Sequence, residues 1–158
     1  YKYLKNISIS FDLLLAILLF DETNNCEYFC HKYKVSSKLN ENLTSTFKIF
    51  MEIKKDPDFF KKNLRKNVYL YGKEKLKKSA ILQFFEQTND KKNDLSSNLD
   101  NIKKEMAPVF SYDGDYLKKR GMKEGVLIGK TLNIIEKEWI KNNFKISEDQ
   151  ISFIIKNQ

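Results

Sequence analysis

The sequence has few of the residues that interrupt helices. Only two prolines and five glycines occur among 158 residues, and no long stretch alternates between apolar and polar side chains. Proline removes a backbone hydrogen-bond donor, and alternation is the pattern of half-buried strands. The sequence therefore predicts an all-α protein, an irregular array of many helices that ends in a small helical hairpin.

Cysteine and histidine are equally scarce, which argues against several kinds of site. Cys26, Cys30 and His31 are the only cysteines and the only histidine, whereas a structural zinc ion takes four ligands. We expect no metal site and no disulfide framework, and we predict no catalytic residue. Cysteines without a disulfide framework are typical of a reducing compartment, so a cytoplasmic location is expected.

Long apolar runs are also lacking. The run from Leu13 to Phe20 spans eight residues, far short of the roughly 20 that a membrane-spanning helix needs. Asp12 precedes this run and Asp21 follows it, which is unlike the flanks of an export signal. The run predicts a buried helix, and we expect neither a membrane span nor export.

Helical periodicity is what the sequence contains in quantity. Apolar residues recur at spacings of three and four, the pattern of helices with one buried face. The predicted helices lie at about residues 9–20, 25–34, 38–55, 58–71, 74–88, 95–106, 115–120, 126–142 and 148–156. Pro57 is expected to open the helix at 58–71, and Gly72 is expected to end it.

A polar segment at residues 87–100 divides the chain. Asn, Asp, Ser and Lys dominate this segment, a composition typical of flexible connections. We expect a helical body at residues 1–88, a polar connector and helix at 89–106, and a C-terminal helical tail at 107–158.

The positive charge is concentrated in one window. The formal net charge is +8, and ten basic residues against three acidic ones lie between Lys54 and Lys78. Such a cluster is typical of nucleic-acid binding, because the phosphates of a backbone attract several cations at once. The alternative is a lysine-rich composition that scatters cations over solvated faces, but it does not explain why acidic residues are rare in this window.

The segment GMKEGVLIGKT, residues 121–131, ends like the phosphate-binding loop of P-loop NTPases. That motif needs a glycine where this chain has Glu124, and it follows a strand. We expect a helix, a turn and a second helix instead. Gly121 and Gly125 would shape the turn, and Gly129 would allow close approach to a neighbouring helix.

Asp113 and Asp115 imitate the paired carboxylates that hold magnesium in nucleotidyl transfer. That task needs carboxylates fixed on rigid elements with a third acid nearby. Here both residues precede Tyr116 and Leu117 at the start of an expected helix, and aspartate is a favoured N-cap residue. We therefore expect a helix cap at this place.

Three parts of the chain resemble a known enzyme family. They are FSYDGDYLKKRGMKEGVLIGKTLNIIEKEWIKNNFKIS, SFDLLLAILLF with CHKYKVSSKLNENL, and VYLYGKEKLKKSAILQF. Together they are similar to the helical body and tail of bacterial class II CCA-adding tRNA nucleotidyltransferases, of the poly(A) polymerase family. The matching positions in the C-terminal stretch are Gly121, Gly125, Gly129, Leu132, Glu136 and Trp139, and Val126 stands where the family often has proline.

The resemblance implies that this chain is one part of a longer enzyme. Family members carry an N-terminal catalytic head with a Gly-Ser motif and a metal-binding Asp-x-Asp, followed by a neck that selects CTP or ATP. This sequence contains none of those motifs and opens on Tyr1 rather than Met. The parent protein would add CCA to tRNA 3′ ends, with magnesium, CTP and ATP bound to its head. Poly(A) addition is the alternative activity.

The chain itself would bind tRNA through the phosphate backbone, with no DNA partner expected. Lysine offers a mobile point charge, which fixes register without reading bases. On charge and resemblance together, the expected RNA contacts are Lys61, Lys62, Arg65, Lys66, Lys73, Lys77, Lys78, Lys118, Lys119, Arg120, Lys123 and Lys130. A competing hypothesis is a non-enzymatic helical interaction module whose basic face meets an acidic partner or a membrane surface.

Overall fold

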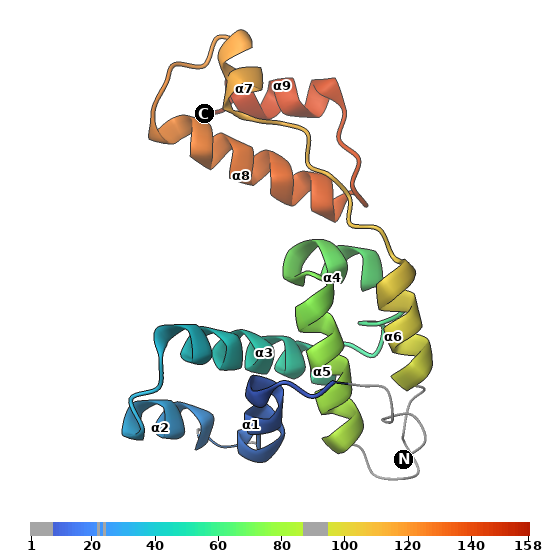
Figure 1. Ribbon diagram of the computed structural model, residues 1–158. Coiled ribbons are helices and arrows are strands. Elements are labelled where there is room, and N and C mark those ends of the chain that lie inside the picture. The colour runs from blue at the N-terminus through green and yellow to red at the C-terminus, as the bar shows by residue number, and fades with distance from the viewer. Residues whose placement is uncertain (1–7, 22, 24, 87–94) are drawn as a thin grey trace. The chain divides into compact units, whose positions relative to one another are not determined.

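The computed structural model consists of α-helices and their connections (Figure 1). It describes residues 8–21, 23, 25–86 and 95–158, and within these ranges it contains no strand. The helices are α1 (Phe11–Leu19), α2 (Asn25–Lys32), α3 (Ser37–Lys55), α4 (Leu64–Tyr71), α5 (Lys73–Glu86), α6 (Leu95–Lys104), α7 (Gly114–Lys119), α8 (Val126–Lys141) and α9 (Glu148–Lys156). The all-α class predicted from the sequence is confirmed.

The helices form two compact units, and each has its own core. The first unit extends to Ala107 and contains α1 to α6, while the second begins at Pro108 and contains α7 to α9. Within the first unit, α6 packs against α5. The predicted polar connector lies partly at residues 87–94, which are outside the described residues.

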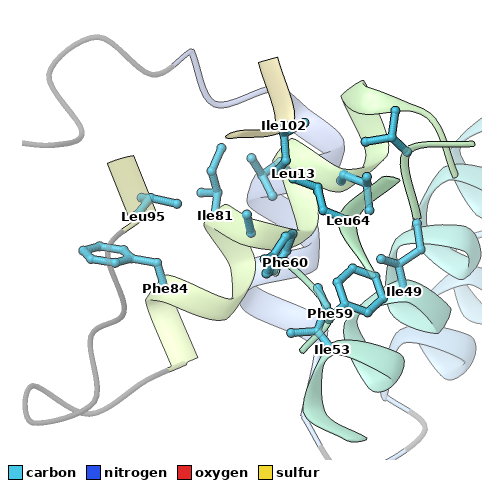
Figure 2. Close-up of a cluster of buried hydrophobic side chains, with 13 residues drawn as sticks. Leu13, Ile49, Ile53, Phe59, Phe60, Leu64, Ile81, Phe84, Leu95 and Ile102 are labelled. Atoms are coloured by element: carbon cyan, nitrogen blue, oxygen red, sulfur yellow. The ribbon is translucent and has the colours of Figure 1, made fainter. Parts of the chain in front are cut away.

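Helix α5 forms the centre of the first unit. It packs against α1, α3, α4 and α6, and its residues Leu76 and Ile81 belong to the main hydrophobic cluster. Figure 2 shows Leu13 of α1, Ile49 of α3 and Ile102 of α6 in the same cluster. Removing such apolar surface from water is the main favourable contribution to folding, so α5 holds this unit together.

The second unit is built around one buried side chain from each of its helices. Leu117 of α7, Ile135 of α8 and Ile151 of α9 are all 0% exposed. The ring of Trp139 adds edge-on contacts, with its centroid 5.2 Å from that of Phe110 and 4.9 Å from that of Phe144. Ile135 and Trp139 therefore lie on the inner face of α8.

The start predicted for the fourth helix is wrong. Helix α4 begins at Leu64, and residues 57–63 form consecutive turns, so Pro57 does not open the helix. The Asp56 carboxylate accepts hydrogen bonds from the Asp58 backbone N–H at 2.9 Å and from the Asn63 side-chain amide at 2.8 Å. A carboxylate that satisfies nearby donors stabilises turns at the expense of helix.

Two of the predictions for glycines are confirmed and one is wrong. Gly72 ends α4 at a φ of 76°, while Gly121 and Gly125 shape the α7–α8 turn at φ values of 88° and 141°. Only glycine adopts such angles without steric cost. Gly129 allows no close helix approach, because it is exposed and a Cβ there would meet no atom within 4 Å.

Truncation of Ile135 tests the core of the second unit. We expect Ile135→Ala to lower the free energy of unfolding by about 2–5 kcal/mol, because it leaves a cavity among side chains that cannot close around it. Trp139 is the only tryptophan and lies in this unit, so its fluorescence in a urea titration reports the change. The exposed Lys137→Ala on the same helix is the control, and an equal shift in both variants would contradict this core assignment.

Candidate nucleic-acid interface

The turns at residues 57–63 present the first predicted RNA contacts, and hydrogen bonds hold these turns in place. Besides the bonds to Asp56, the buried Asn67 side-chain amide donates to the backbone carbonyl of Phe59 at 2.8 Å. The ring of Phe59 is itself buried in the core. The turns are thus anchored at both ends, and their remaining side chains are displayed on a fixed backbone.

Four of the predicted contacts lie on these turns and on the first turn of α4. Lys61, Lys62, Arg65 and Lys66 are all exposed. Lys62 is paired with Asp58 at 3.2 Å, but its side chain stays 80% exposed, so solvent weakens this pair. Among the described residues, Lys61 and Lys66 form no ion pair. Their ammonium groups remain available to an anion.

The lysines predicted on the following helix are engaged within the protein. Lys73 donates from Nζ to the backbone carbonyl of Lys103 at 2.7 Å, and Lys77 pairs with Glu74 at 2.7 Å. Lys78 donates to the carboxylate of Asp12. A phosphate would have to replace these partners or share the ammonium groups with them. The assignment of Lys73, Lys77 and Lys78 as RNA contacts stays a prediction.

A shallow hollow of about 400 Å³ lies beside the turns and contains charges of both signs. Lys55 and Lys66 line it together with Glu52 and Asp56, so the charges balance. The hydroxyl of Tyr71 donates to Glu52. Burial, and then this bond to a carboxylate, raise the pKa of Tyr71 far above its ordinary value, which keeps the phenol neutral. Because its positive and negative charges balance, this hollow attracts phosphate only weakly.

The predicted RNA contacts of the second unit also differ in whether they are paired within the protein. Lys118 lies within ion-pair distance of Asp115 at 3.4 Å and of Glu124 at 2.6 Å, and the hydrogen bond to Glu124 raises the pKa of Lys118. Lys119, Lys123 and Lys130 are exposed and form no ion pair with described residues. Among the RNA contacts predicted in this unit, these three lysines remain available to an anion.

Arg120 takes part in a network that joins α7 to α9. Its guanidinium is paired with Glu148 and lies 3.7 Å from the centroid of the Tyr116 ring. The Tyr116 hydroxyl donates to the two carboxylate oxygens of Glu148 at 3.1 and 3.0 Å. Burial and this bond raise the pKa of Tyr116 to about 12. Arg120 thus has a structural role, and its contact with RNA stays a prediction.

The residues that imitate other sites have structural roles. Asp113 caps α7, because its carboxylate accepts the backbone N–H of Tyr116 at 2.8 Å. The Gly-Lys-Thr ending lies inside α8, after a helix and a turn, which is the arrangement expected from the sequence. Neither segment has the surroundings of a nucleotide or magnesium site.

Cys26 and Cys30 lie on α2 and line a hollow of about 750 Å³. Burial, and then the proximity of Cys30, raise the pKa of Cys26 to about 11. A thiol with such a pKa is almost entirely protonated near pH 7, and the thiolate is the nucleophile and the metal ligand. Among the described residues, no three histidine, cysteine or acidic side chains are grouped so as to hold a metal ion.

Sequence reasoning missed one pair of cations that the fold brings to the turns. Lys103 and Lys104 lie in the last turn of α6 and are exposed. Lys104 lines a hollow together with Lys61, about 40 residues earlier in the chain. Two adjacent lysines at the end of a predicted helix could have indicated a further basic site. Nothing in the sequence showed that they would lie beside the turns at 57–63.

Comparison of the chain with family models, curated proteins and solved structures found no match. Where the structure describes the chain, none of its helices has the length and apolar character needed to cross a bilayer. The available cations at residues 61–66 and around the α7–α8 turn are therefore the features from which a function must be inferred.

The pair between Lys78 and Asp12 predicts a pH-dependent contribution to stability. Burial tends to raise the pKa of Asp12, but hydrogen bonds from Lys78 and Ser10 outweigh it and hold that pKa below the ordinary 3.8. The carboxylate therefore stabilises the fold above about pH 4, and this contribution is lost as the pH falls through the lowered pKa. We expect Asp12→Asn to cost about 1 kcal/mol near pH 7 and less near pH 3, below the ordinary pKa of the carboxyl.

Urea unfolding of the first unit, followed by circular dichroism at both pH values, measures this difference. The control is Glu41→Gln, which removes an exposed carboxylate of α3. A cost for Asp12→Asn that is the same at both pH values would show that the charged pair contributes nothing.

Proposed function

We propose that this chain binds folded tRNA through its phosphate backbone, as the RNA-gripping part of a longer tRNA nucleotidyltransferase. The observation that carries the proposal is the cluster of exposed cations on the fixed turns at 57–63 and on α4. Phosphates along an RNA reward several cations on one surface, because each contact releases condensed counterions. The resemblance of the sequence to CCA-adding enzymes supports tRNA as the particular RNA.

The same resemblance supports a division of labour in the parent protein. A head that holds magnesium, CTP and ATP would perform nucleotidyl transfer, and this chain would position the tRNA. The chain supplies no candidate catalytic residue of its own. In a poly(A) polymerase, the close alternative, the surface would bind RNA in the same way, because lysine contacts to phosphate carry no base specificity.

A helical interaction module is a second candidate, favoured by one observation on α1. Phe11, Leu14 and Leu18 are spaced along one face of this helix and are 69%, 47% and 72% exposed. A continuous exposed apolar patch is typical of a protein-interaction surface.

Neutralisation of Lys62 and Lys66 tests the RNA proposal. If about four phosphates are contacted, the logarithm of tRNA affinity should fall with the logarithm of salt with a slope near −3. We expect Lys62→Gln combined with Lys66→Gln to lower the affinity about tenfold and to make the slope about two units less steep. Fluorescence anisotropy of labelled tRNA over a salt series measures both quantities.

The matched control combines Lys38→Gln with Lys48→Gln on α3, which removes the same charge from exposed positions outside the basic window. An equal loss in both double variants would show that only net charge matters. Absence of tRNA binding at low salt would overturn the proposal. Binding to anionic lipid vesicles or to acidic peptides without binding to tRNA would favour the interaction module instead.

A further inference from the structure

A hollow of about 490 Å³ lies on the first unit, between the turns at 57–63 and the end of α6. Phe60 and Lys61 line it on the side of the turns. Lys104 lines it from α6, and Glu105 and Met106 line it from the segment that follows. We call it the α4–α6 groove. Its volume is within the range of sites that take small ligands or parts of larger ones.

The two sides of the α4–α6 groove are held at a fixed separation. Leu64 of α4 and Ile102 of α6 belong to the same buried cluster, where they are 6% and 0% exposed. Lys73 at the start of α5 donates its ammonium hydrogen bond to the carbonyl of Lys103 near the end of α6. The groove is therefore a feature of the packed core, and a ligand finds it already formed.

The charges on the α4–α6 groove favour an anion. Lys61 and Lys104 lie on opposite sides, both are exposed, and neither forms an ion pair with any residue that the structure describes. Glu105 is the acidic residue among the described residues that line it. A phosphate between the two lysines would contact a cation on each side, which flat clusters of lysine do not provide.

The apolar part of the α4–α6 groove favours a nucleotide over a bare phosphate. Met106 lines the groove and is 79% exposed, and a methionine thioether makes favourable contacts with aromatic rings. Proteins that bind single-stranded nucleic acid combine cations along the backbone with side chains against which bases pack. In a duplex the bases are stacked inside the helix, so only an unpaired nucleotide can place its base on Met106.

We propose that the α4–α6 groove binds one unpaired nucleotide of the RNA partner. Its phosphate lies between Lys61 and Lys104, and its base packs on Met106. This inference rests on the proposed RNA-binding function and adds a preference to it: the chain discriminates RNA with an unpaired segment from RNA that is fully paired.

The experiment compares Lys104→Gln with Lys103→Gln, using the whole chain. The two lysines are adjacent on α6, but only Lys104 lines the groove. We expect Lys104→Gln to weaken binding of tRNA about fivefold and of a blunt, fully paired RNA duplex less than about twofold. Lys103→Gln should change either affinity less than about twofold.

Met106→Ala supplies a second readout that charge alone would not move. We expect it to weaken tRNA binding about threefold while the salt dependence stays unchanged, because an apolar contact releases no counterions. Its effect on the duplex should be negligible. Fluorescence anisotropy with both labelled RNAs over a salt series measures every variant.

The outcomes separate this inference from the proposed function. Equal effects of Lys103→Gln and Lys104→Gln, or an equal loss for tRNA and duplex, would overturn the groove as a nucleotide site. If the Lys62 and Lys66 double variant weakens tRNA binding and Lys104→Gln does not, the groove fails while the RNA-binding function stands. If the unaltered chain binds no tRNA, both proposals fail together.

Discussion

The burial of α5 is the constraint on which the first unit depends. This helix packs against α1, α3, α4 and α6, and it contributes Leu76, Ala80, Ile81 and Phe84 to one hydrophobic cluster. Because so many of its side chains are in contact with neighbours, α5 cannot shift without opening the core. The ends of α4 and α6 are thereby brought together, and the lysines at those ends come to share one surface.

This packing sorts the cations of the basic window into two groups. Lys54, Lys77 and Lys78 pair with acidic side chains, and Lys73 donates to a backbone carbonyl. The turns at 57–63 and the start of α4 pack through buried Phe59 and Phe60 and display their lysines to solvent. Lys54 and Lys78 reach carboxylates of neighbouring helices, and Lys77 pairs with Glu74 of its own helix. On the turns and the start of α4, the pair of Lys62 with Asp58 is weakened by solvent, and Lys61 and Lys66 form no ion pair with described residues.

In the α7–α8 turn, residues that resemble part of a phosphate-binding loop have structural roles. Gly121 and Gly125 adopt positive φ angles, which accounts for glycine at both positions without a bound ligand. Glu124 and Glu148 pair with Lys118 and Arg120 at the α7 end of this turn. The cations around the turn therefore serve partly to join α7 with its neighbours, and Lys119, Lys123 and Lys130 carry what remains of a basic surface.

The sequence by itself determined the helices, because a 3.6-residue period and its interruptions are local properties of the chain. It predicted the all-α class, a helix cap at Asp113 or Asp115 and the turn glycines, and it located the basic window. It did not predict that the Asp56 carboxylate, through its hydrogen bonds with Asp58 and Asn63, holds turns where a helix was expected to begin. It also did not predict that Gly129 is exposed to solvent. Only the tertiary structure decided which lysines are paired and that Lys104 lies opposite Lys61, because those relations are made by the packing of α5 between α4 and α6.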